Sequence, residues 1–254
     1  MPNGGSDCCG TCWFNSTHEG KAGYFDTPPD AQVRCVIRDL VIEEPFWTYC
    51  PNHPHHNPEK LSIPIGPVYR DAGGYPYRRE VWVESPDSEE IRLQLLRLLE
   101  TMSENPVVEY PSSPQLDEAV IDQLMRFGER RAVPGLKRAC NFDPLATPIG
   151  NNPFERSRAF TVAHALEALA ALIGDEALPE LTWGLTCGLE QARAMLDYDL
   201  QKDNLAVIRY YSVRGLSHCS PERSREWLLQ AATDLNQEIA TLAKELLATR
   251  KNGV

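Results

Sequence analysis

The sequence lacks the features that mark a secreted or membrane-bound protein. Its first residues include neither the basic segment nor the apolar core of a secretion signal. No stretch approaches the roughly 18 consecutive apolar residues that a membrane-spanning helix needs. Pro2 stands where N-myristoylation requires a glycine. We therefore expect a cytoplasmic protein with no membrane partner.

Signals for nucleic-acid binding and for catalysis are also missing. The 254 residues carry a formal net charge of -11, which repels phosphate backbones, and no run of Lys or Arg offsets it. Gly73-Gly74 is followed by neither the Lys-Ser/Thr pair nor the helix of a phosphate-binding loop. No Ser, Cys and His arrangement suggests a catalytic triad. These absences favour a binding protein over an enzyme, although they do not decide between the two. We do not expect the protein to bind nucleic acid.

Cysteine, by contrast, is crowded near the N-terminus. Five of the eight cysteines fall in the first 50 residues, within a segment that is rich in Pro, Gly, His and aromatics up to about residue 80. In a chain without a secretion signal, such crowding favours metal binding over disulfides. The segment has little aliphatic core, and a metal ion would supply the missing stability. We expect short strands there at 33–37 and 80–83.

Two sequence knuckles contain most of the candidate ligands. Cys9-Gly10-Thr11-Cys12 allows both thiolates to face one ion, and Cys50-Pro51-Asn52-His53 repeats that spacing with a histidine in the last place. Zinc takes four such ligands in a tetrahedron, so we expect one structural Zn²⁺ per chain held by four of five residues, Cys9, Cys12, Cys35, Cys50 and His53. Either four thiolates bind the ion, or the two knuckles pair and His53 replaces Cys35. Cys8 is a further substitute within the first knuckle, and an iron–sulfur cluster is an alternative use of the thiolates.

From about residue 85 onward the pattern becomes helical. Apolar residues recur at helical spacing from Val162 to Ile173 and from Leu235 to Leu246. Ser-Pro pairs beginning at Ser85, Ser113 and Ser220 are typical helix starts, because Ser caps the first amides and Pro has no amide to cap. The sequence predicts helices joined by short connections, over residues 87–103, 114–127, 132–140, 154–173, 177–196, 203–217, 221–232 and 235–249.

One connection occurs twice in related form. Gly128-Glu129 leads to an Ala-Val-Pro segment ending at Pro134, and Gly174-Asp175 leads to Ala-Leu-Pro ending at Pro179, with the two glycines 46 positions apart. We expect each glycine to close a helix in the left-handed conformation, each acid to lie near the positive end of the next helix, and each proline to occupy its first turn.

This pattern resembles the turn of bacterial HEAT repeats, including those related to phycobilisome lyases, whose period is about 40–47 residues. The resemblance implies a mainly α fold, an α-solenoid of antiparallel helical hairpins over residues 81–254. Residues 1–80 then form a small, irregular, metal-stapled module. Part of that module, residues 7–69, is similar to a segment of uncharacterised bacterial proteins, and this similarity implies no activity.

Stacked helical hairpins form extended surfaces that suit protein binding. We therefore expect a non-enzymatic zinc-binding adaptor or scaffold that binds a protein partner through its helical-repeat surface. The alternative is an enzyme or accessory factor of the lyase or cofactor-maturation type, acting on a chromophore or a protein substrate, which the resemblance suggests by analogy.

Other reactive or aromatic residues in the helical part have simpler explanations. We expect Cys140, Cys187 and Cys219 to be small buried side chains, because none has a partner at ligand spacing. His164 faces either solvent or a groove. Aromatic residues are expected to pack between helices, with a role in partner binding as the alternative; they are Trp183, Trp227, Tyr210 and Tyr211.

Overall fold

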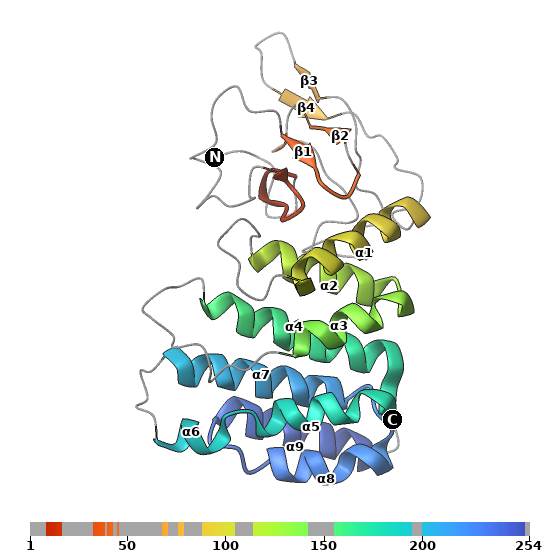
Figure 1. The fold of residues 1–254 in the computed structure, drawn as a ribbon. Coiled ribbons are helices and arrows are strands. Elements are labelled where there is room, and N and C mark those ends of the chain that lie inside the picture. Colours follow the sequence, from red (N-terminus) through yellow and green to blue (C-terminus); the bar gives the residue numbers. More distant parts are fainter. Residues whose placement is uncertain are drawn as a thin grey trace. The chain divides into compact units, whose positions relative to one another are not determined.

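A computed structural model of the chain describes its secondary structure at residues 9–16, 33–38, 40–42, 45, 68–70, 76–78, 88–104, 114–141, 155–194 and 200–251. The contacts between residues divide the chain into two compact units. The first comprises Met1–Leu98 and Val107–Gln123, and the second comprises Leu99–Pro106 and Leu124–Val254. Figure 1 shows the helices and strands of the chain.

The N-terminal unit contains short strands and one tight turn. The 3-10 turn η2 covers Cys9–Thr11. Strand β1 (Arg34–Cys35) pairs antiparallel with β2 (Leu40–Val41). The strand predicted over 33–37 is therefore confirmed, but it is shorter than predicted. Strand β3 (Val68–Arg70) pairs antiparallel with β4 (Pro76–Arg78). The strand predicted at 80–83 lies outside the described residues.

Two amphipathic helices follow, and each is shared between the two units. Helix α1 (Glu89–Glu104) buries Ile91, Leu95 and Leu99, which recur every four residues. It begins two residues later than predicted, because the side chain of Ser88 accepts a hydrogen bond from the amide of Ile91 at 3.3 Å and caps the helix there. Helix α2 (Pro114–Arg126) begins at the predicted proline.

The second unit is built from the remaining helices, and the chain is mainly α-helical as predicted. In order they are α3 (Val133–Cys140), α4 (Glu155–Ile173), α5 (Leu178–Thr186), α6 (Leu189–Ala194), α7 (Leu200–Leu216), α8 (Pro221–Ala231) and α9 (Gln237–Lys251). No described helix combines the length and the apolarity that crossing a membrane requires.

The repeated connection has the conformation that the sequence predicts. Gly128 and Gly174 have φ angles of 63° and 56°, in the left-handed region that a side chain disfavours. A 3-10 turn accompanies each glycine: η6 (Arg130–Ala132) begins two residues after Gly128, and η7 (Gly174–Ala177) begins at Gly174 itself. Pro134 and Pro179 then lie in the first turn of α3 and of α5, which confirms their predicted position.

Two predicted elements need correction. The single helix predicted over 177–196 is divided into α5 and α6 by Cys187 and Gly188, and Gly188 has a φ of 61°. The last helix begins at Gln237, and Leu235 is 53% exposed, so Leu235 does not belong to the buried face predicted for it. Ile239, Ala240 and Ala243 form the buried face of α9 instead.

The helices of the second unit pack in a regular order. The short helices α3, α5 and α8 contact the longer helices α4, α7 and α9, each short helix packing on the next long one along the chain. The long helices also contact one another, α4 against α7 and α7 against α9 (Figure 1). Helix α4 is therefore covered on most sides, and between Ala159 and Leu172 only Phe160, Thr161, His164 and Ala171 escape full burial.

Candidate functional site

The first knuckle forms a compact turn around the predicted ligands Cys9 and Cys12. The amide of Cys12 donates to the carbonyl of Cys9 at 3.3 Å, and the amide of Asn15 donates to the carbonyl of Cys12 at 3.1 Å. The buried side chain of Asn15 donates from Nδ2 to the Cys9 carbonyl at 3.0 Å. Asn15 therefore closes the turn from inside and fixes the backbone that carries the two thiols.

The chain after the knuckle pairs with the strand that carries Cys35. Asn15 and Cys35 form an antiparallel bridge, and the amide of Val36 donates to the carbonyl of Phe14 at 2.8 Å. Strand pairing thus brings Cys35 beside a knuckle that lies more than twenty positions earlier in the sequence.

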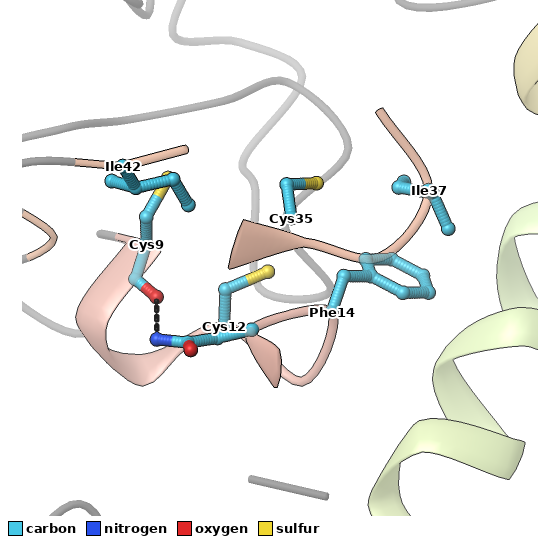
Figure 2. Close-up of a pocket in the computed structure, with 7 residues that line it drawn as sticks. Cys9, Cys12, Phe14, Cys35, Ile37 and Ile42 are labelled. Carbon is cyan, nitrogen blue, oxygen red and sulfur yellow. Dashed lines mark hydrogen bonds between the residues drawn. The ribbon is translucent and has the colours of Figure 1, made fainter. Parts of the chain in front are cut away.

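All three cysteines line one small pocket in the first unit. Cys9, Cys12 and Cys35 are 6%, 6% and 8% exposed. Figure 2 shows their side chains around a common space, with Phe14, Ile37 and Ile42 completing the apolar wall. The pocket therefore offers soft sulfur ligands in a dry surrounding, and a structural zinc ion uses such ligands.

The complete predicted ligand set is not described. Cys50 and His53, like Cys8, lie outside the described residues. Among the residues that are described, no three His, Cys, Asp or Glu side chains form a group placed to hold a metal ion. The donor types around the pocket fit zinc, and the choice of four ligands from the five candidates stays a prediction.

The cysteines of the helical part are buried, as the sequence predicts for small packed side chains. Burial is the main cause that raises the pKa of Cys140 far above its ordinary range, and nearby Glu180 adds to the effect. Burial also raises the pKa of Cys219 to about 11, with a further contribution from Asp175. A raised thiol pKa keeps these groups protonated at neutral pH, which makes them poor nucleophiles and poor metal ligands.

A polar contact links two successive turns of the second unit. Asp175, which follows Gly174, accepts hydrogen bonds from the amide and the hydroxyl of Ser220, both at 2.8 Å. Ser220 is the residue before α8, as the Ser-Pro signal predicts, but its hydroxyl serves Asp175 and makes no cap bond within its own helix. The equivalent acid Glu129 behaves as expected and accepts from the amide of Arg131 at 3.1 Å.

A buried ion pair lies at the next connection. Arg209 of α7 is 1% exposed, and its Nε donates to Asp234 at 2.9 Å. Asp234 precedes α9 and also accepts from the amide of Asn236 at 2.8 Å. Arg209 Nη1 has no hydrogen-bond partner among the described atoms. The pair ties α7 to the connection between α8 and α9.

A cluster of aromatic and charged side chains lies between α4 and α7. The rings of His164 and Tyr211 are 4.7 Å apart, and the guanidinium of Arg214 lies 4.9 Å from the centre of the Tyr211 ring. Arg214 also pairs with Glu167 at 2.8 Å. Tyr210 meets Tyr211 edge to face. Sequence reasoning considered His164 and the two tyrosines separately and missed the cluster, because its members come together only when α4 and α7 pack.

In comparisons with known proteins, the chain matches no protein-family model, no curated protein and no solved structure.

Proposed function

We propose that this protein is a non-enzymatic adaptor: a HEAT-like helical-repeat array that binds a protein partner, with an N-terminal module held together by zinc. The observation that carries the proposal is the packing order of the second unit. Each short helix packs on the following long helix, and the long helices pack on one another. Such nearest-neighbour stacking is typical of helical-repeat proteins, which use the extended surface it creates to bind other proteins.

Contacts between equivalent positions support the repeat. His164 contacts Tyr211 and Glu167 contacts Arg214, so both pairs are separated by 47 positions. Because both contacts advance together along the two helices, α4 and α7 run parallel, as equivalent helices of successive hairpins do. Asp175 bonds Ser220 at a separation of 45 positions. These separations agree with the 46 positions between Gly128 and Gly174 and with the period of HEAT repeats.

The buried thiols of Cys140 and Cys219 give no support to a lyase-type function. Such a function would use a thiolate or a similarly activated group in a polar cleft. The pKa values of Cys140 and Cys219 are instead raised by burial, which moves both groups away from reactivity.

In the proposed metal site, one structural zinc ion is held by four of the five residues Cys9, Cys12, Cys35, Cys50 and His53. The support is the pocket that the buried Cys9, Cys12 and Cys35 share. With four protein ligands the ion would contribute folding energy to a module that has few aliphatic side chains. Asn15 would hold the knuckle in shape through the Cys9 carbonyl.

The zinc proposal is tested by replacing Cys9 and Cys12 with Ser in the full chain. We expect about one zinc per chain in the unaltered protein and none in the double variant, by elemental analysis of protein purified without added metal. Far-ultraviolet circular dichroism should keep most of its helical signal. Cys187→Ala, which removes a buried thiol outside the pocket, is the matched control and should retain zinc. Protein without metal and with oxidised knuckle thiols would contradict the proposal.

The adaptor proposal is tested by affinity purification of the tagged full chain from its native host, with quantitative mass spectrometry. An adaptor should retain one or a few proteins in amounts comparable to its own. Recovery of the chain alone, together with turnover of a small molecule by the purified protein, would contradict the proposal.

A further inference from the structure

The cluster between α4 and α7 lies along a stripe of half-buried positions. On α7 the positions that are not fully buried between Leu205 and Leu216 recur every three or four residues, at Ala206, Val207, Tyr210, Tyr211 and Arg214. On α4 the corresponding stripe includes His164 beside the nearly buried Glu167. We call the five residues His164, Glu167, Tyr210, Tyr211 and Arg214 the aromatic seam.

The composition of the seam differs from that of the outer face of a short helix. The exposed positions of α8 include Glu222, Arg223, Arg225 and Glu226, which is the mixed charge of an ordinary solvated surface. The seam instead combines two tyrosines, a histidine ring and an arginine with one nearly buried glutamate, Glu167. Tyr and Arg are among the residue types that contribute most to protein interfaces.

The guanidinium of Arg214 is held in place before any partner binds. Glu167, whose side chain is 10% exposed, forms an ion pair with Nη2 at 2.8 Å, and the guanidinium lies 4.9 Å from the centre of the Tyr211 ring. The Arg214 side chain nevertheless stays 43% exposed. A planar guanidinium that is held by an ion pair and stays partly exposed is suited to a carboxylate, which it can bind through two parallel hydrogen bonds.

From this geometry we propose that the aromatic seam docks a protein segment that presents one carboxylate beside an aromatic or aliphatic side chain. The carboxylate binds Arg214, and the apolar side chain lies against the rings of Tyr210 and Tyr211. The proposal rests on the adaptor function and names the surface and the partner chemistry. A highly acidic partner is disfavoured because the chain itself carries a net charge of -11, whereas a single carboxylate at a fixed cation is not.

The test uses a random-peptide display library selected against the full chain, followed by affinity measurements on the enriched peptides by fluorescence anisotropy. The principal variant is E167Q/R214Q, which removes both charges of the pair at once and leaves no buried charge without its partner. Tyr210→Ala is a second variant that does not depend on the ion pair. Arg225→Gln is the matched control, because it removes an exposed arginine from α8.

We expect the enriched peptides to share an Asp or Glu next to an aromatic or aliphatic residue. Their affinity should fall about tenfold or more in E167Q/R214Q and in Tyr210→Ala, and should stay unchanged in Arg225→Gln. Replacing the peptide's acid by its amide should weaken binding to the unaltered chain and should have little further effect on E167Q/R214Q.

Peptides that bind all folded variants equally would overturn the docking surface and leave the adaptor function standing. Selection of peptides without a carboxylate that still require Tyr210 would overturn the assigned partner chemistry. Failure to select any peptide, together with the absence of a retained protein in the affinity purification, would count against the adaptor function itself.

Discussion

Replacing Asp234 by Ala should strongly destabilise the helical unit. The carboxylate is 6% exposed and is paired with the nearly buried Arg209 at 2.9 Å. Its loss leaves a guanidinium without a counter-charge in a dry position, where Nη1 already lacks a described hydrogen-bond partner. Removing one partner of a buried pair costs about 3–5 kcal/mol. The amide of Asn236 also loses its acceptor, which adds to the cost.

This loss is large compared with the total stability of about 5–15 kcal/mol that is usual for a folded domain. Urea unfolding followed by circular dichroism at the helical band measures it, and the midpoint should fall by more than about 1 M. The exposed pair of Arg193 and Glu190 supplies the control, since Glu190→Ala should cost less than about 0.5 kcal/mol.

The double variant R209M/D234A distinguishes the cost of an unpaired buried charge from the cost of lost packing. It should be less destabilised than the sum of its two single variants, because no charge is left stranded. If Asp234→Ala costs no more than Glu190→Ala, or if the two single effects simply add, the pair does not join α7 to the connection before α9 as described.

Three further predictions concern the same unit. Gly184→Ala should lower the melting temperature at a cost of about 1–3 kcal/mol, because its added Cβ would lie 2.1 Å from Ser212 Oγ; an unchanged melting curve would show that the contact is looser. Cys219, whose pKa burial raises to about 11, should react slowly with iodoacetamide at pH 8 in the folded protein and quickly in urea, as mass spectrometry of the labelled peptide would show. Hydrogen bonds from the amide of Ser220, and to a smaller extent from its hydroxyl, lower the pKa of Asp175 below the ordinary 3.8. The ionised Asp175 therefore contributes its full stabilisation above pH 3.8, and this stabilisation is lost as the pH falls through the lowered pKa. Asp175→Asn should therefore make stability less sensitive to acid in this range, and equal acid sensitivity would contradict the assignment.

The helical fold was largely predictable because its signals are local. Gly128, Gly174, Pro134 and Pro179 each have one favoured place at the end or the start of a helix, and each occupies that place. Gly188 also ends a helix in the left-handed conformation, but the helix predicted over 177–196 continued through it. A Cβ there would lie 2.6 Å from Leu205, and that proximity depends on how α7 packs, which the local sequence around Gly188 does not state.

The candidate sites show the same difference between local signals, which the sequence reveals, and long-range contacts, which it does not. The spacing of Cys9 and Cys12 identified a knuckle, but the place of Cys35 beside it depends on pairing between Asn15 and β1. Likewise, Asp175 was expected only to lie near the positive end of the next helix, and its bonds to Ser220 form because the turns of successive hairpins are adjacent. Long-range pairing of this kind leaves no pattern within a single segment of sequence.

Zinc-edge X-ray absorption of the protein as purified tests the central claim most directly, since an adaptor with a structural metal needs a closed coordination sphere. We predict one zinc per chain with four protein ligands, at least three of them sulfur at about 2.3 Å, and no bound water. The same spectrum from the C9S/C12S variant should show no zinc. A site with three protein ligands and a water would indicate a catalytic metal and would contradict the account of this protein as a non-enzymatic adaptor.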